Sequence, residues 1–255
     1  MSGRFEGKVA VVTGAASGLG FALAQRFASE GAKVLATDVA EQGLARVGET
    51  AGVRTLRIDV SDASQIQEMI DSAIATEGGV DVLCNNAGVL GNFRPAGEAT
   101  LEDWDRIIGV NLSGPFFATR AVIPHMVEKG GGVIVNISSV AGLAGAGEGA
   151  AYVASKHGLV GLSRNTAVMY AQDGIRCIAF CPGGIESGIA TQFFAERERG
   201  LVSERGVEVF DRVSAANLRI APPEEMAAAV AFLASEEGVV INGAAIEADG
   251  GWRAH

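Results

Sequence analysis

Two side chains four residues apart could together move a proton to or from a hydroxyl group. Tyr152 and Lys156 lie in a segment with helical periodicity, so their side chains share one face. A free tyrosine has a pKa of about 10, and only about one phenol in a thousand is ionised at pH 7. A nearby cation favours the phenolate, although lowering the pKa by about three units needs roughly 4 kcal/mol. The pair predicts a general base that becomes an acid in the reverse reaction.

Ser139 could supply the hydrogen bond that such a reaction needs. It stands thirteen residues before Tyr152 at the end of an apolar run, and its hydroxyl could stabilise an alkoxide forming on a substrate. Ser138 is adjacent but would point to the opposite face of a strand, so we favour Ser139. None of the three histidines fits this group, because His157 directly follows Lys156 and would face away from it. No clustered His, Cys, Asp and Glu residues suggest a catalytic metal.

A glycine-rich turn lies between an apolar run and a helical segment. Its sequence, Thr13 to Gly20, has the spacing G-x-x-x-G-x-G rather than the G-x-G-x-x-G of many dinucleotide folds. Glycines there permit a tight turn and let a pyrophosphate approach the backbone N–H groups at a helix N-terminus. The predicted contacts are Gly14, Ser17, Gly18, Leu19 and Gly20.

Asp38 ends the second apolar run, 18 positions after Gly20, where a carboxylate can accept hydrogen bonds from an adenosine ribose. It could also cap the helical segment that starts near Glu41, and both roles can hold together. A 2′-phosphate carries about −1.5 to −2 charges and would be repelled there. No Arg or Lys lies between Gly14 and Gly18 or next to Asp38 to neutralise it. The sequence therefore favours NAD over NADP.

Alternating strands and helices must position these residues. Short runs rich in β-branched residues alternate with longer amphipathic segments. Strands that are apolar on both faces and separated by helices predict a parallel sheet covered on both sides. The fold class is therefore α/β, a doubly wound, Rossmann-like sheet of about seven strands. We expect strands at 9–12, 33–37, 53–58, 80–84, 133–137, 175–180 and 244–247, and helices at 19–30, 63–76, 101–128, 151–172 and 224–234.

The simplest organisation is one domain over residues 1–255, because no linker rich in Pro, Ser or charge divides the chain. Residues 186–217 interrupt the alternation of strands and helices. They mix apolar residues with the charge run 196–199, which we interpret as a solvated helix face. The segment is long enough to form a lid over a site at the C-terminal edge of the sheet.

The composition argues against several classes of partner. Apolar residues make up 48% of the chain and charged residues 20%, as in a folded globular protein. The net charge is −10, and the 20 Lys and Arg form no long run, so nucleic acid is not an expected partner. The first apolar run is too short for a signal peptide or a membrane span, which favours a cytoplasmic location. Cys84, Cys177 and Cys181 match no disulfide or zinc pattern and should be small core residues.

In combination, these residues resemble the short-chain dehydrogenase/reductase family, over almost the whole chain. The resemblance rests on an ordered set at the family spacing: Thr13 to Gly20, Asp59-Val60, Asn85-Asn86-Ala87-Gly88, Asn111, Ser139, Tyr152-Val153-Ala154-Ser155-Lys156 and Pro182-Gly183. It implies an NAD-dependent oxidoreductase that interconverts a secondary alcohol and a ketone by hydride transfer. It also implies a homotetramer, and the long apolar stretches in 101–128 and 151–172 are consistent with packing between subunits.

The resemblance assigns roles to single residues. Asp59 should meet the adenine amino group, and Val60 should lie beside the ring. Lys156 should bind the nicotinamide ribose, and Asn111 should hold a water that relays protons from Lys156 to solvent. The positive charge of the oxidised nicotinamide should help Lys156 to favour a phenolate at Tyr152. Further cofactor contacts are implied for Asn86, Ala87, Gly88, Pro182, Gly183, Ile185 and Ser187; Cys181 stands where the family often has Asn and receives no role.

The resemblance also places the substrate pocket in 90–93, 140–149 and the segment after Gly183. Ser139, Tyr152, Leu143 and Gly149 are the predicted substrate contacts. Most of the lining is small and apolar, with Arg94 and Glu148 as the charged exceptions. Such a pocket favours a neutral secondary alcohol or ketone, of alicyclic or steroid-like shape.

Two other functions compete with this interpretation. A 3-ketoacyl-thioester reductase belongs to the same family, but such enzymes generally use NADPH, against which Asp38 argues. A non-catalytic dinucleotide sensor that regulates a partner usually lacks the Tyr and Lys pair, which this chain keeps in Tyr152 and Lys156.

Overall fold

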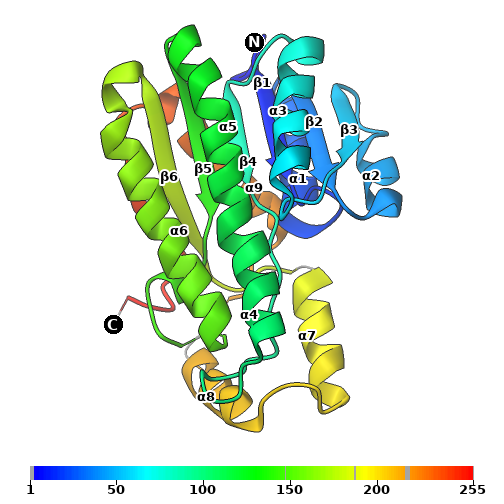
Figure 1. Ribbon diagram of the computed structural model, residues 1–255, viewed down its shortest axis with the longest axis vertical. Helices are drawn as coiled ribbons and strands as arrows, with labels where there is room; N and C mark the ends of the chain where they lie inside the picture. The colour runs from blue at the N-terminus through cyan, green and yellow to red at the C-terminus, as the bar shows by residue number, and fades with distance from the viewer. Residues whose placement is uncertain (1–2, 147, 187, 216–218, 255) are drawn as a thin grey trace.

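Seven parallel strands form one sheet in the order β3-β2-β1-β4-β5-β6-β7, as the computed structural model in Figure 1 shows. The structure describes residues 3–146, 148–186, 188–215 and 219–254. The strands are β1 (Val9–Thr13), β2 (Lys33–Asp38), β3 (Val53–Arg57), β4 (Val82–Asn85), β5 (Gly132–Ile137), β6 (Ile175–Pro182) and β7 (Ala245–Ala248). Every predicted strand is present, with ends that differ by no more than two residues, and the predicted parallel pairing is confirmed.

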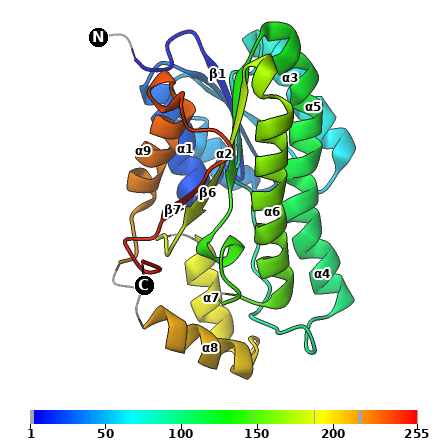
Figure 2. The same ribbon diagram turned by 90° about the vertical axis from the view of Figure 1, so that its left-hand side faces the viewer.

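Helices cover both faces of the sheet. The first face carries α1 (Gly18–Ser29), α2 (Glu41–Val47) and α9 (Pro223–Ala234), and the second carries α3 (Ala63–Glu77), α5 (Gly114–Lys129) and α6 (Ala150–Met169). Figure 2 shows α1 and α9 on one side of the strands and α3, α5 and α6 on the other. The doubly wound α/β fold predicted from the sequence is therefore confirmed.

The strands have apolar side chains on both faces because each face packs against helices. All five residues of β1 are buried. On the first face they belong to a core that includes Leu23 and Phe27 of α1, and on the second to a core that includes Ile70 of α3 and Met126 of α5. The two cores hold the strands in a fixed frame. The three cysteines are buried and unpaired, as expected for small core residues.

The helix predicted over residues 101–128 is broken in the structure. It consists of α4 (Leu101–Ile108), a π-helical turn (Gly109–Ser113) and α5. A π turn inserts one extra residue into the helix and is frequent at functional sites. Here it contains Asn111, whose side chain is fully buried. The hydrophobic periodicity alone did not reveal this irregularity.

The segment predicted to be a lid contains two helices, α7 (Gly188–Glu198) and α8 (Glu204–Ser214). They lie beyond the carboxyl ends of the strands, at the bottom of Figure 1. Glu198 and Arg199 of the charge run are exposed, as predicted, and Arg197 of α7 binds both carboxylate oxygens of Asp211 of α8, at 2.9 and 2.7 Å, in an exposed ion pair. Residues 187, 216 and 217 of the segment lie outside the described part of the chain.

The winding of the chain reverses between β1 and β4. β1 pairs with β2 on one side and with β4 on the other. In open parallel sheets, ligands bind outside the carboxyl ends of the strands at such a switch point. Thr13, Asp38, Asn85, Ile137 and Pro182 all end strands at this edge, where the candidate residues therefore gather. In the described part of the chain, no helix is both long and apolar enough to cross a membrane.

Candidate active site

Lys156 is buried at the carboxyl end of β5. Its Nζ atom donates a hydrogen bond of 2.8 Å to the carbonyl oxygen of Ile137 and lies 5.5 Å from the centroid of the Tyr152 ring. Burial lowers the pKa of the Lys156 ammonium to about 8. The prediction that Tyr152 and Lys156 share one helix face is confirmed.

Burial also dominates the proton affinity of Tyr152. Desolvation raises the pKa of the phenol above its ordinary value, the charge of Glu148 raises it further, and the Ser139 hydroxyl opposes both. The sequence-based expectation named cations that should lower this pKa. The protein's own groups, however, raise the pKa of Tyr152, because burial and the charge of Glu148 outweigh the effect of Ser139. The chain by itself keeps the phenol protonated, which is the state that donates a proton.

The two serines after β5 face in different directions, as the strand geometry predicted. The Ser138 hydroxyl donates a 3.0 Å hydrogen bond to the carbonyl oxygen of Lys156, and so fastens α6 to the end of the strand. The Ser139 oxygen accepts from the N–H of Ala141 at 3.1 Å, while its hydroxyl interacts with Tyr152. The choice of Ser139 as the active-site serine agrees with this arrangement.

Gly142 lies in the stretch 140–149 that the sequence assigned to the pocket, and the structure adds a packing role that was not predicted. A Cβ atom there would lie 2.4 Å from the Ser138 oxygen and 2.8 Å from the carbonyl oxygen of Lys156. Only a glycine lets the turn after β5 approach α6 so closely. The glycine three residues after Ser139 was visible in the sequence, but its packing against α6 was not.

Asn111 holds the loop that follows β4. Its Oδ1 atom accepts from Val89 N at 2.8 Å, and its Nδ2 atom donates to Val89 O at 3.0 Å and to Ser155 Oγ at 3.3 Å. A Cβ atom on Gly88 would lie 3.5 Å from Asn111 Oδ1 and 3.7 Å from Lys156 Nζ. The structure therefore brings Asn111 and Lys156 to one place, while the Asn111 amide is engaged by the backbone. Its role in holding a water stays a prediction.

The glycine-rich turn fits a dinucleotide pyrophosphate. Gly14 and Gly18 have φ of +67° and +53°, in the left-handed region that favours glycine. A Cβ atom on Gly20 would lie 2.1 Å from the carbonyl oxygen of Gly14. Ser17 precedes α1 without a side-chain cap, and Leu19 lies in the first turn of the helix. The N–H groups of that turn have no partners within the helix and point toward the sheet edge, where phosphate oxygens can bind.

Asn86 joins the ends of the two strands at the switch point. Its Nδ2 atom donates to Thr13 O at 2.9 Å and to Gly14 O at 3.1 Å. The Thr13 hydroxyl accepts from the N–H groups of Asn86 and Ala87 at 3.0 and 3.1 Å. This arrangement agrees with the implied role of the Asn86 to Gly88 stretch in holding β4.

Asp38 lies against the glycine-rich turn. Its carboxylate accepts from Ala16 N at 3.0 Å and from Ala40 N at 2.9 Å. The residue that caps α2 is Ala40, so the alternative of Asp38 as the helix N-cap is wrong. The sequence analysis also missed Arg46, whose guanidinium lies 4.7 Å from the centroid of the Phe21 ring and 3.4 Å from the carbonyl oxygen of Ala16. Helix α2 brings Arg46, which is distant in sequence, close to the glycine-rich turn.

The remaining residues of the cofactor set border the same edge. Asp59 accepts hydrogen bonds from the N–H and hydroxyl of Ser61, and Val60 is buried. Pro182 ends β6, Gly183 N donates to Ala248 O at 3.1 Å, and Ile185 forms an isolated bridge with Ala221. Ser187 lies outside the described residues.

The predicted substrate contacts lie on closely packed loops. A Cβ atom on Gly149 would lie 2.6 Å from both the backbone nitrogen and the backbone oxygen of Arg94. The carbonyl oxygen of Leu143 accepts a hydrogen bond from the Arg253 guanidinium at 3.2 Å. Phe93, after β4, packs against Phe193 of α7, with ring centroids 4.4 Å apart. Helix α7 thus packs against the loop after β4.

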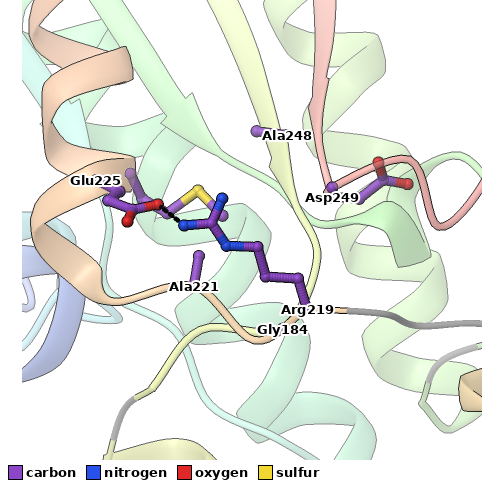
Figure 3. Close-up of a pocket in the computed structure, with 8 residues that line it drawn as sticks. Gly184, Arg219, Ala221, Glu225, Ala248 and Asp249 are labelled. Carbon is purple, nitrogen blue, oxygen red and sulfur yellow. Dashed lines mark hydrogen bonds and ion pairs between the residues drawn. The ribbon is translucent and has the colours of Figure 1, made fainter.

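A pocket of about 130 Å³ lies near the carboxyl ends of β6 and β7, away from the four catalytic candidates. Figure 3 shows that an ion pair between Arg219 and Glu225 crosses it. Asp249 of the same lining accepts from the N–H groups of Gly251 and Arg253 at 2.9 Å each. The charged groups there bind the protein itself, so this pocket is not a second candidate site.

The two described histidines, His125 and His157, contact the protein backbone. His125 Nε2 accepts from Val80 N at 3.1 Å, and the exposed His157 lies 2.9 Å from the carbonyl oxygen of Val153. His255 lies outside the described residues. Within the ranges that the structure describes, no three His, Cys, Asp or Glu side chains form a group that could hold a metal ion.

Comparisons with known proteins show the family to which the chain is similar. The family described as short chain dehydrogenase matches residues 8–198. 3beta-hydroxysteroid dehydrogenase 2 from Eggerthella lenta is 39% identical, covering 98% of this chain and 96% of that protein. The crystal structure of levodione reductase superposes with a TM-score of 0.89 at 36% identity, over 98% of this chain and 99% of that one. 3-Ketoacyl-(acyl-carrier-protein) reductase from Brucella melitensis complexed with NADH gives a TM-score of 0.86 at 34% identity, over 97% and 99% of the chains.

The packing at Gly142 makes a stability prediction. Gly142→Ala places a methyl group against Ser138 and the backbone of Lys156, so we expect the free energy of unfolding to fall by about 1–3 kcal/mol. Gly145→Ala in the same loop is the control, because a Cβ there meets no atom within 4 Å. Urea denaturation followed by circular dichroism measures both. Equal stabilities of the two variants would contradict the tight fit of the turn against α6.

Proposed function

The chain belongs to the short-chain dehydrogenase/reductase family, and from this premise we propose that it is an NAD-dependent enzyme that interconverts a neutral secondary alcohol and a ketone. One observation carries the proposal. Tyr152 and Lys156 lie 5.5 Å apart, ring centroid to Nζ, with Ser139 beside the phenol, at the sheet edge where the glycine-rich turn opens. In this fold, the residues proposed to move the proton and the turn proposed to bind the dinucleotide therefore lie at the same edge of the sheet.

The chain's own residues account for the proton chemistry. In ketone reduction, the protonated Tyr152 donates its proton to the substrate oxygen while Ser139 donates a hydrogen bond to the same oxygen. In alcohol oxidation, Tyr152 takes the hydroxyl proton. The buried Lys156 ammonium, held by the carbonyl of Ile137, favours the phenolate that then forms. When bound, the nicotinamide supplies or accepts the hydride.

Asp38 supports NAD as the cofactor. Its carboxylate lies within hydrogen-bond distance of the glycine-rich turn, where an adenosine ribose would be expected. A 2′-phosphate at that place would meet this negative charge. Arg46 also lies near the turn, but its guanidinium lies over Phe21 and donates to the carbonyl of Ala16. That engagement supports the choice of NAD over NADP.

The charged groups around the proposed pocket support a neutral substrate. Arg94 forms an ion pair with Asp103. Arg106 donates to the carbonyl of Leu90 at 2.8 Å, and Glu148 accepts from three backbone N–H groups. Because these charged groups already bind other parts of the protein, the substrate would be recognised mainly by the apolar loops and the aromatic rings of the lid. An alicyclic or steroid-like alcohol suits such a pocket.

A ketoacyl-thioester reductase is the second candidate, because one of the similar structures carries that name. Asp38 argues against an NADPH-dependent reductase, but that structure is complexed with NADH, so a screen with acyl-thioester substrates, not the cofactor, separates the two candidates. The Tyr152 and Lys156 pair speaks against a non-catalytic dinucleotide sensor.

Exposed apolar side chains support a homotetramer. One group lies on α4 to α6 and includes Leu101, Trp104, Phe116 and Val168, and another lies on and after α9 with Phe232, Val239 and Val240. Two separate apolar surfaces suit a tetramer, which needs two kinds of contact in dihedral symmetry. A single catalytic domain is supported by the one continuous sheet, and the unpaired cysteines are compatible with a reducing cytoplasm.

Tyr152→Phe tests the proton chemistry. Removing the phenol hydroxyl should lower turnover by about two to four orders of magnitude, measured by nicotinamide absorbance in a screen of secondary alcohols and ketones. Tyr170→Phe is the matched control, because it changes the chain's other tyrosine at the far end of α6. If Tyr152→Phe turned over as fast as the control, the proposed mechanism would be wrong.

Asp38→Asn tests the cofactor. The unchanged protein should use NADH in preference to NADPH. The substitution removes the repulsion of a 2′-phosphate, so kcat/KM with NADPH relative to NADH should rise by about tenfold to a hundredfold. Glu41→Gln, at the start of α2, should leave this ratio unchanged. A preference of the unchanged protein for NADPH would refute the assignment.

The mass in solution tests the assembly. Light scattering coupled to gel filtration should give four times the 26.1 kDa chain mass. A monomer at working concentration would contradict the tetramer.

A further inference from the structure

Glu148 lies just before α6, and three backbone N–H groups donate to its carboxylate. Oε1 accepts from Gly91 at 2.9 Å and from Phe93 at 3.2 Å, and Oε2 accepts from Gly149. The carboxylate therefore joins the loop after β4 to the start of the helix that carries Tyr152. In the sequence, Glu148 was only a charged exception in an apolar pocket.

The turn that Glu148 holds has an unfavourable backbone conformation. Asn92 and Phe93 both have φ of +56°, and no other described non-glycine residue has a positive φ. The left-handed region is uncommon for residues with a side chain, most of all for two in succession. Because Oε1 accepts from Gly91 and Phe93, its two hydrogen bonds enclose Asn92. The carboxylate stabilises this conformation.

The lid docks on the same turn. Ser203 N, just before α8, donates to Asn92 O at 2.9 Å. A Cβ atom on Gly206 would lie 1.9 Å from Phe93 O, so α8 touches the turn directly. The Phe93 ring packs against Phe193 of α7 and Phe210 of α8, at centroid distances of 4.4 and 5.1 Å. The shape of the turn therefore decides where both lid helices rest.

Glu148 is also four residues before Tyr152, just outside the start of α6. Its negative charge raises the pKa of the phenol, in addition to the effect of burial. The other groups that face Tyr152 are Ser139, after β5, and Lys156, on α6. Arg106 of α4 faces Glu148 itself, and the described residues of α7 and α8 meet the turn through Phe193, Phe210 and backbone.

We propose that Glu148 is a positioning residue that couples lid docking to the catalytic tyrosine, because its carboxylate both shapes the turn under the lid and holds that turn to the start of the helix that carries Tyr152. The inference rests on the proposed function, in which Tyr152 moves the proton. A lid that is seated on the turn keeps Gly91 and Phe93 in place as donors to Glu148. The carboxylate then keeps its place at the start of α6 while the site is closed.

Glu148→Gln tests the coupling, since it keeps the size of the side chain and removes its charge. Without that charge the phenolate is less unfavourable, so the pKa of Tyr152 falls. The acid limb of kcat/KM for alcohol oxidation should move to lower pH by about half to one pH unit. The amide keeps only one acceptor oxygen for three N–H groups, so KM for the alcohol should rise by about threefold to tenfold.

Glu98→Ala is the control, because a glutamine there would still accept the hydrogen bond of the Ser203 hydroxyl. Glu98 lies in the same connection between β4 and α4 and accepts from the Ser203 hydroxyl at 2.7 Å, so it holds the lid without facing Tyr152. Its loss should raise KM and leave the pH profile of kcat/KM unchanged. A rise in KM for both variants with a pH shift only in Glu148→Gln supports the coupling.

A second readout does not depend on activity. Arg199 and Arg205 are exposed trypsin sites between and within the lid helices. Looser docking should make their cleavage several-fold faster in both variants, as followed by mass spectrometry. A Glu148→Gln protein with unchanged pH profile, whether or not cleavage changes, overturns the coupling. If the unchanged protein oxidises no alcohol in the screen, the proposed function fails, whereas the cleavage rates still test the link between Glu148 and the lid.

Discussion

Two hydrogen bonds that cross between the end of β5 and α6 determine the rest of the site. Ser138 donates from the strand end to the backbone of Lys156, and Lys156 donates from the helix to the backbone of Ile137. Because both ends of this contact are tied, Ser139 and Tyr152 face each other with little freedom to separate. Both bonds lie behind the two side chains, so the geometry of the proposed proton transfer depends on them.

The contact is buried, and burial favours the neutral form of both Tyr152 and Lys156. A low-dielectric site disfavours charge, so the phenol retains its proton and the ammonium loses its proton more readily than in water. The site therefore holds its proton-moving pair closer to neutrality than isolated side chains would be. Charges that approach during the reaction have a large effect in such surroundings, because little water screens them.

Much of the fold and part of the site could be predicted from the sequence because they follow from local patterns. Apolar runs marked the seven strands, and the alternation of side chains along a strand distinguished Ser139 from Ser138. The π turn at Asn111 could not be predicted, since it is a one-residue irregularity inside an otherwise continuous helical pattern. The engagement of Glu148 by three N–H groups and the approach of Arg46 to the glycine-rich turn depend on contacts between distant segments. The raised pKa of Tyr152 depends on burial, which composition does not reveal.

The glycines at 142, 149 and 206 leave no room for side chains between the loops and helices around the pocket. A side chain at any of these three glycines would collide with neighbouring atoms, so this side of the proposed pocket, which we call the wall, cannot be reshaped by substitution there. By contrast, Leu143 and Ala144 beside them are half-buried, and a Cβ on Gly145 meets open space. New substrate ranges are therefore most accessible to evolution or to protein engineering at 143–145 and in the aromatic residues of the lid. The geometry of Ser139, Tyr152 and Lys156, to which we assign the proton transfer, can remain the same while the substrate changes.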